Sequence, residues 1–209
     1  TVAINLAGTQ NIVGAFHQPG LVVIDPDTLK TLSARHWANG LAEALKAGIA
    51  GNASLLELLE KEDAEENIER ILHYALLYKK QIVEEDETEQ GARKLLNFGH
   101  TIGHGIEAAC GLDAAEGGLL HGECVALGML PMIESKTLRR RALAAMKKLG
   151  LPTKYSCSTE DILHHMQNDK KRENDTITVV RVKKAGEAYL EKLSWDELAM
   201  LVRGEAGSV

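Results

Sequence analysis

The sequence predicts a mainly α-helical protein with short β segments near both ends of the chain. From Asp27 to about Gln167, apolar residues recur at spacings of three and four, which is the pattern of amphipathic helices. Residues 1–26 and 176–193 instead contain aliphatic, β-branched runs or alternate apolar with polar side chains. With 209 residues, the chain is long enough to bury a core in one or two domains.

Residues 1–26 are expected to be extended and to be the remnant of a separate domain. Val2–Leu6 and residues 21–24 are aliphatic runs separated by glycine and proline, and neither has an evident partner strand. The chain begins with Thr1 rather than Met, so we expect it to be a piece of a longer protein. The expected division is therefore a remnant at 1–26 and a helical domain at 27–209.

Helices are predicted from apolar spacing combined with capping residues. Asn52 and Ser158 can cap first turns, and Gly150 follows a last turn. A charged connection is expected at 86–96 and a glycine-rich loop at 111–118. The predicted helices cover 33–49, 52–60, 66–84, 98–110, 120–134, 138–149 and 158–167.

The C-terminal part of the chain predicts a β-hairpin followed by one more helix. Residues 176–182 and 188–193 alternate around the turn Lys184-Ala185-Gly186. Ser194 and Glu197 then have the spacing of a capping box. We find no internal repeat and no low-complexity segment.

Composition narrows the classes of function. A net charge of −6 argues against general nucleic-acid binding. No apolar run reaches the roughly 18 residues of a membrane span, and no signal peptide opens the chain. The three cysteines form no CxxC pair, so we expect reduced thiols in a cytoplasmic protein. They are Cys110, Cys124 and Cys157.

The segment 93–107 carries the strongest chemical signal. His100 and His104 are four residues apart, which places both imidazoles on one face of a helix. Such a pair suits a metal ion or an anionic substrate. The same spacing is as often a chance pair of histidines that lie on the surface or bond to carbonyl oxygens.

Three glycines in seven residues interrupt the same predicted helix. Each costs about 1 kcal/mol of helix stability relative to alanine. We therefore expect another part of the molecule, or a ligand, to approach this backbone closely. The glycines are Gly99, Gly103 and Gly105.

A third histidine and a carboxylate extend the possible site. His121, in His121-Gly122-Glu123, begins another apolar helix and can point into a cleft. A catalytic zinc site with an open position needs a carboxylate beside two histidines, and Glu43 is a candidate. By spacing alone, the simpler interpretation is a surface ion pair between Glu43 and Lys46.

Basic residues could supply an anion-binding part of the site. Arg93 and Asn97 are four residues apart and share the face that leads to His100. For the other cations, a solvated helix end or a charged loop is the simpler interpretation. Those cations are Lys79, Lys170 and Lys171.

Six stretches of the chain occur in the order found in one known family. The blocks LNFGHTIGH at 96–104 and HGECVALGM at 121–129 are the most specific. On these residues the chain resembles the C-terminal part of the 3-dehydroquinate synthase family, within the sugar-phosphate cyclase superfamily. The resemblance implies the multi-helix C-terminal domain of that fold. The six stretches are 11–19, 25–32, 40–46, 86–107, 119–129 and 169–171.

The resemblance also implies a role for each matching residue. It implies three metal ligands: Glu43, His100 and His121. His104 becomes a substrate contact rather than a ligand, and Glu89 helps to order the substrate pocket. The substrate would be held by Lys46, Lys79, Arg93, Asn97 and one of Lys170 and Lys171, of which we favour Lys171. Contacts to the nicotinamide cofactor would come from Asn11, Thr28, Leu29, Lys30 and Thr31.

The implied reaction converts 3-deoxy-arabino-heptulosonate 7-phosphate to 3-dehydroquinate and phosphate, a step of the shikimate pathway. The family uses NAD and a divalent metal, Zn2+ or Co2+, and forms homodimers. The implied partner is thus a small phosphorylated sugar acid, with neither nucleic acid nor membrane involved.

Two features depart from the family pattern. The chain has no GxGxxG loop after a strand, so we expect NAD to be bound mostly by an N-terminal domain that precedes it. Thr1 and Gln10 stand where the family has lysines. The alternatives are a non-catalytic metal-binding fragment, or another sugar-phosphate cyclase such as 2-deoxy-scyllo-inosose synthase.

Overall fold

The computed structural model describes residues 2–6, 9–15, 17, 19–111, 118–169 and 176–206. The chain forms two compact units, Thr1–Lys30 and Thr31–Val209, which are described separately. Lys170, Lys171 and most of the predicted glycine-rich loop, residues 112–117, lie outside the described residues.

The first unit contains an antiparallel hairpin. β1 (Val2–Leu6) pairs with β2 (Thr9–Ala15), with Ala3 opposite Gly14. The prediction that Val2–Leu6 lacks a partner strand was therefore wrong. β2 was not predicted because several of its residues are polar and it contains no aliphatic run as long as that of β1.

Residues 21–24 do not form the extended strand that their aliphatic side chains suggested. They have no regular structure, and the side chains of Leu21 and Val23 are about four-fifths exposed. A strand requires a neighbour that supplies backbone hydrogen bonds. In the part of the chain that the structure describes, no strand lies beside this segment. It leads into the short 3-10 helix η1 (Pro26–Thr31).

The second unit is helical, as predicted, and its predicted elements are all present with shifts at their ends. The helix expected from residue 98 begins at His100, because Gly99 adopts a left-handed φ of +79°. The helices are α1 (Ala34–Ala50), α2 (Ala53–Lys61), α3 (Ile68–Glu85), η2 (Ala92–Asn97), α4 (His100–Cys110), α5 (His121–Met129), η4 (Leu130–Met132), α6 (Lys136–Lys148), α7 (Thr159–Asp169) and α8 (Trp195–Ala206).

Side chains cap several of these helices as the sequence indicated. The side-chain oxygen of Asn52 accepts a hydrogen bond from the Leu55 N–H at 3.1 Å, and Ser158 Oγ accepts one from Asp161 at 3.0 Å. Ser194 and Glu197 form the predicted reciprocal capping box at the start of α8.

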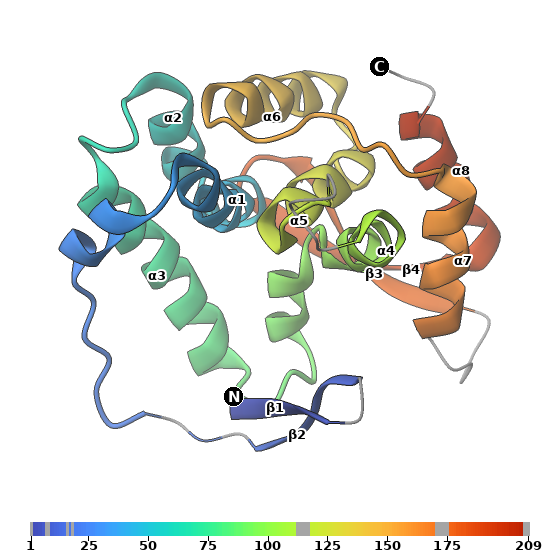
Figure 1. The fold of residues 1–209 in the computed structure, drawn as a ribbon, viewed down its shortest axis with the longest axis horizontal. Helices are drawn as coiled ribbons and strands as arrows, with labels where there is room; N and C mark the ends of the chain where they lie inside the picture. Colours follow the sequence, from blue (N-terminus) through green and yellow to red (C-terminus); the bar gives the residue numbers. More distant parts are fainter. Residues whose placement is uncertain are drawn as a thin grey trace. The chain divides into compact units, whose positions relative to one another are not determined.

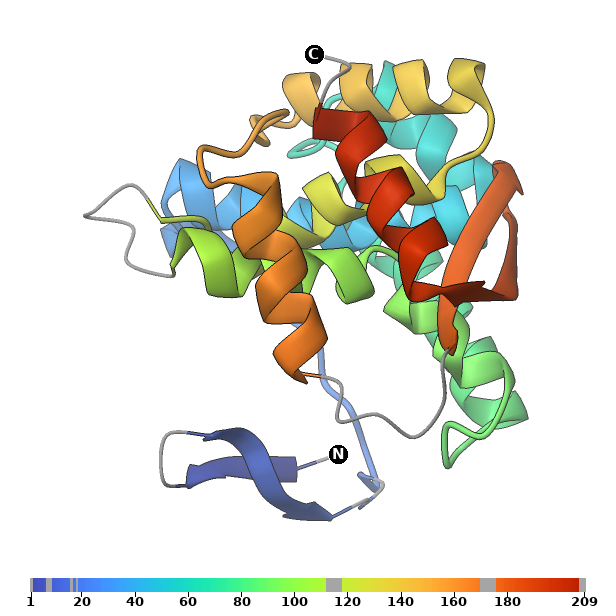
Figure 2. The ribbon, with the colours of Figure 1, turned by 90° about the vertical axis from the view of Figure 1, so that its right-hand side faces the viewer.

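The core of this unit is built around α5, whose residues from Gly122 to Met129 are all buried. α5 lies between α1 and α4, and α7 packs against α4 on the far side from α1 (Figure 1). α2 and α3 pack against α1, and α8 lies beside α7 (Figure 2). This arrangement brings the middle of α1 and the first turns of α4 and α5, which carry predicted site residues, into one place.

The C-terminal hairpin was also predicted correctly. β3 (Thr176–Lys184) pairs antiparallel with β4 (Glu187–Ser194), and Gly186 in the turn has a φ of +85°. Val179, Val180, Val182 and Leu193 turn into the core. The hairpin thus covers one side of the helical unit.

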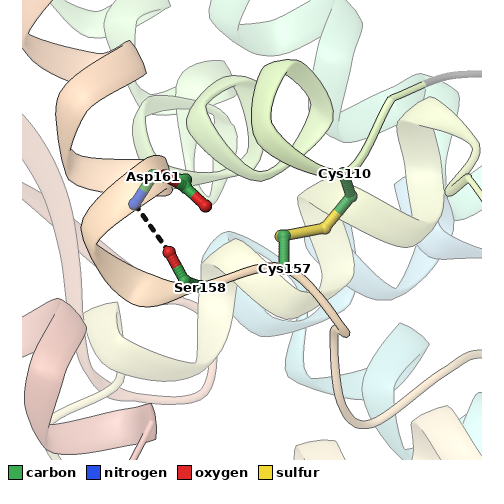
Figure 3. Close-up of a disulfide and its surroundings, with 4 residues drawn as sticks. All are labelled: Cys110, Cys157, Ser158 and Asp161. Atoms are coloured by element: carbon green, nitrogen blue, oxygen red, sulfur yellow. Dashed lines mark hydrogen bonds between the residues drawn. A yellow bond between two sulfur atoms is a disulfide. The ribbon is translucent and has the colours of Figure 1, made fainter.

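The expectation of three reduced cysteines was wrong. Cys110 at the end of α4 and Cys157 before α7 form a disulfide, with their Cα atoms 5.2 Å apart (Figure 3). The two residues are 47 positions apart, so only the packing of α7 against α4 makes them neighbours. Cys124 is a free, buried thiol.

Among the described helices, none is both long and apolar enough to cross a membrane.

Candidate metal and substrate site

Three helices bring one carboxylate and three imidazoles together. Glu43 comes from the middle of α1, His100 and His104 from the first turns of α4, and His121 from the first turn of α5. The three histidine rings form a triangle with centroids 5.4–5.7 Å apart. One ligand atom each from Glu43, His100 and His121 lies within 4.8 Å of the others.

Glu43 is held as an anion by a neighbouring ammonium group. Its Oε2 lies 2.6 Å from Nζ of Lys46, whose side chain is only 9% exposed. Burial raises the pKa of Glu43, but the charge and hydrogen bond of Lys46, together with the two histidines, lower it below its ordinary value. The exposed ion pair considered from spacing alone is therefore a half-buried pair at the site.

His100 is held in its neutral form. Burial, followed by the charge of Lys46, lowers the pKa of His100 to about 4. Its Nδ1 lies 3.3 Å from the carbonyl oxygen of Phe98. Because a carbonyl oxygen only accepts, Nδ1 carries the ring proton and donates a hydrogen bond to that oxygen. Nε2 is left as an acceptor, 3.9 Å from Glu43 Oε1. Two facing acceptors at this separation suit a cation placed between them.

His121 is oriented by a second carboxylate. Its Nδ1 lies 3.1 Å from Glu107 Oε2, on α4 one turn beyond His104. A histidine that donates one ring N–H to a carboxylate presents its other nitrogen as a metal ligand. A second group, His104, Glu107 and His121, also has ligand atoms within 4.8 Å of one another. His121 therefore belongs to two possible metal-binding groups.

The glycines in and next to α4 allow neighbouring helices to approach its backbone closely, as their number predicted. A Cβ on Gly103 would lie 3.1 Å from Cys124 O, and one on Gly128 of α5 would lie 2.3 Å from Gly99 O. A Cβ on Gly105 would lie 2.4 Å from Cγ of Met166 on α7. The approaching groups are therefore neighbouring helices, and their approach brings His100 close to His121.

A second polar group lies in the 86–97 segment. Asn97, which was predicted to hold the substrate, donates a hydrogen bond at 2.7 Å to Glu89, which was predicted to order the substrate pocket. Asp86 accepts from the backbone N–H groups of Gln90, Gly91 and Arg93, and these bonds lower its pKa. Arg93 itself donates to the carbonyl oxygen of Glu87.

The remaining predicted residues lie on other parts of the chain, and their roles at the site stay predictions. Lys79 is exposed on α3. Thr28, Leu29 and Lys30 belong to η1 in the first unit, where Lys30 pairs with Asp27 at 2.7 Å. Lys171 and the side chain of Asn11 lie outside the described residues.

Three polar residues at the site were missed by the sequence reasoning. Glu107 ends the segment 93–107, and Glu123 stands inside the block HGECVALGM, at the N3 position at which a glutamate can cap a helix. Arg35 gave no signal, because its partner Glu123 is 88 positions away. Only the packing of α1 against α5 reveals that pair.

The fold is shared with solved sugar-phosphate cyclases. A 2-epi-5-epi-valiolone synthase from Streptomyces hygroscopicus, solved with NAD+ and Zn2+ bound, superposes with a TM-score of 0.78 at 26% identity, covering 94% of this chain and 58% of that one. A 2-deoxy-scyllo-inosose synthase superposes with a TM-score of 0.79 at 22% identity over 97% of this chain and 61% of that one, a likeness of fold alone.

Sequence comparison is more specific. Residues 40–172 match the sequence model of the 3-dehydroquinate synthase C-terminal domain, and residues 1–39 match that of its N-terminal domain. The chain belongs to the 3-dehydroquinate synthase family. The 3-dehydroquinate synthase of Streptococcus mutans is 39% identical over 93% of this chain and 58% of its own length. That of Prochlorococcus marinus is 39% identical over 85% and 51%. The chain thus spans about half the length of these relatives.

Proposed function

We propose that this chain supplies the metal- and substrate-binding part of a 3-dehydroquinate synthase. The activity is cyclisation of 3-deoxy-arabino-heptulosonate 7-phosphate to 3-dehydroquinate with loss of phosphate. The observation that carries the proposal is the convergence of Glu43, His100 and His121 beside the buried Lys46. Family membership and the curated relatives support this reaction over other chemistry at such a site.

The donor set fits a divalent metal. One anionic carboxylate and two imidazoles leave an open position for substrate oxygen, which is the arrangement of catalytic zinc sites, and cobalt suits the same ligands. When bound, the metal supplies Lewis-acid polarisation of substrate oxygens, and NAD supplies reversible hydride transfer. The valiolone synthase solved with NAD+ and Zn2+ supports this assignment.

The chain's own residues would hold and orient the substrate. Lys46 lies against the carboxylate of Glu43 and places a positive charge at the metal group. His104 offers an imidazole on the same face of α4 as His100. With Lys79, Arg93, Asn97 and Lys171, these groups form a set of cations and donors for a carboxylate and a phosphate. Glu89 would fix the amide of Asn97. Such anchoring holds a dianion in the orientation that phosphate loss requires.

The first unit is proposed to belong to the NAD-binding domain. Residues 1–39 match the N-terminal family model, which supports the expected assignment of 1–26 to that domain. Asn11 and residues 28–31 would then contact the cofactor. A homodimer and a cytoplasmic location are proposed on the same family grounds.

Phosphate release tests the proposal. The chain is incubated with Zn2+, NAD and substrate, with and without a separately produced N-terminal domain, and inorganic phosphate is measured. We expect release in the mixture, and its loss when the chain carries Glu43→Gln. Bound zinc without phosphate release in either case would contradict the enzyme function.

That contrary outcome would favour a second candidate, a non-catalytic metal-binding fragment. The observation behind this alternative is that the chain spans only 58% of the Streptococcus mutans relative. Release of phosphate from a hexose 6-phosphate, rather than from the heptulosonate, would instead indicate another sugar-phosphate cyclase.

A further inference from the structure

Two residues after His121 stands a nearly buried carboxylate that a guanidinium group binds through both oxygens. Glu123 of α5 is 4% exposed. Its Oε1 accepts from Nε of Arg35 at 2.8 Å, and its Oε2 accepts from Nη2 of the same guanidinium at 2.7 Å. Arg35 stands in the first turn of α1, so this pair joins two helices that each carry a proposed metal ligand.

The pair holds the backbone that leads into His121. Glu123 Oε2 also accepts from the Leu120 N–H at 2.8 Å, and Arg35 Nη2 donates to the Gly118 carbonyl oxygen at 2.7 Å. The two side chains therefore bond to two backbone groups at the entry into α5, and Glu123 itself lies two residues after His121. His121 lies between the residues that are held, although neither side chain of the pair contacts its ring in a hydrogen bond.

Asn39 strengthens the same attachment. Its Oδ1 accepts from the Glu123 N–H at 3.3 Å, and a Cβ on Gly122 would lie 2.2 Å from the Asn39 carbonyl oxygen. Arg35, Asn39 and Glu43 follow one another at intervals of four, so they lie along one side of α1. One side of α1 thus supplies the proposed ligand Glu43 and also binds the start of α5, which carries the proposed ligand His121.

We propose that Arg35 and Glu123 are positioning residues that fix His121 relative to Glu43 and thereby set metal affinity. The inference rests on the proposed metal site and adds a function for two residues that do not bind the metal. The planar guanidinium suits this task, because its two N–H groups match the two carboxylate oxygens and restrict rotation. Removing a group that orients a metal ligand commonly changes metal affinity by about 10–100-fold.

The chain contains a matched control. Arg141 of α6 pairs with Glu60 of α2 in the same two-pronged way, at 2.7 and 2.8 Å. The side chains of Arg141 and Arg35 are 39% and 40% exposed. The Arg141–Glu60 pair also joins two helices, but neither α2 nor α6 carries a proposed ligand. Arg35→Gln and Arg141→Gln therefore break comparable pairs with different consequences for the site.

The experiment measures Zn2+ affinity of the whole chain by competition with a chromophoric chelator. We expect Arg35→Gln to weaken binding by about 10–100-fold and Arg141→Gln to change it less than about 2-fold. Arg35→Lys keeps the positive charge but cannot bind both carboxylate oxygens in the planar arrangement of a guanidinium group. The zinc affinity of this variant should therefore fall between those of wild type and Arg35→Gln. Thermal unfolding identifies any variant that is not folded, and Glu123→Gln, which keeps the side-chain shape, then replaces Arg35→Gln.

Amide exchange provides a readout that needs no metal. In the metal-free chain, exchange across 118–124 should accelerate in Arg35→Gln and stay at the wild-type rate in Arg141→Gln. Equal zinc affinity in Arg35→Gln and Arg141→Gln would overturn the inference while leaving the proposed metal site intact. If wild type binds no zinc, the metal site fails, and unchanged exchange across 118–124 would then refute the positioning of His121 as well.

Discussion

The histidine junction of α1, α4 and α5 and the 86–97 segment both supply proposed substrate residues, but they are held together in different ways. In the junction, Arg35 reaches Glu123 across 88 positions. In the 86–97 segment, Asp86 reaches the Arg93 N–H across seven positions and Asn97 reaches Glu89 across eight. The side-chain bonds that hold the junction are long-range, whereas those within the segment are local, although η2 also packs against α3, β3 and β4.

Removing a ligand should produce the largest effect on the junction. We expect Glu43→Ala and His121→Ala each to weaken zinc binding by at least about 100-fold, because two remaining ligands cannot hold the ion. Calorimetric titration measures the change. His73→Ala, which alters an exposed histidine on α3, is the control and should bind like wild type. Unchanged binding in both ligand variants would remove the metal site from the proposal.

Opening the disulfide should have the next largest effect, because it ties the end of α4 to the segment before α7. A cross-link between residues 47 positions apart restricts the unfolded chain, so its loss should lower the free energy of unfolding by about 2–4 kcal/mol. Thermal unfolding with and without a dithiol reductant measures this. The double variant Cys110→Ser/Cys157→Ser should not respond to the reductant. A wild-type Tm that is insensitive to reductant would contradict the expectation.

A side chain inserted between α4 and α5 tests whether their close packing stabilises the fold. In Gly128→Ala, the new Cβ would meet Gly99 O at 2.3 Å, so we expect a loss of about 1–3 kcal/mol in the free energy of unfolding. Gly40→Ala is the matched control, because nothing lies within 4 Å of its Cβ and it lies in the helix α1. That change should stabilise the chain by up to about 1 kcal/mol. Equal effects would show that the helices separate easily.

The smallest and most local effect is expected in the 86–97 segment. Backbone hydrogen bonds from Gly91, Arg93 and Gln90 lower the pKa of Asp86 below its ordinary 3.8. Since the folded-state pKa is the lower one, the stabilisation is fully present above pH of about 4 and is lost as the pH falls through the folded-state value.

Asp86→Asn should therefore accelerate amide exchange at Gly91 and Arg93 at neutral pH, with zinc affinity unchanged. The difference from wild type should shrink once the pH falls below 3.8, the ordinary pKa of this carboxyl. Hydrogen exchange followed by NMR measures it. A fall in zinc affinity would show that the segment and the junction are coupled after all.

Local signals in the sequence were reliable where the interaction is local. Asn52, Ser158 and the Ser194–Glu197 box cap the helices they were expected to cap. The α4 glycines indicated a close approach, and the structure identifies α5 and Met166 as the approaching groups. Strand β2 was missed because pairing with β1, rather than its own apolar content, makes it a strand.

The sequence by itself determined the helices, their caps, the C-terminal hairpin and, through the two specific blocks, the family. These features depend on residues a few positions apart or on motifs read in order. Only the tertiary structure decided that Cys110 meets Cys157, that Glu107 holds the ring of His121, and that Arg35 grips Glu123. Each of those contacts joins residues from different elements, because a helix determines which side chains share a face, and only its packing determines which partner that face meets.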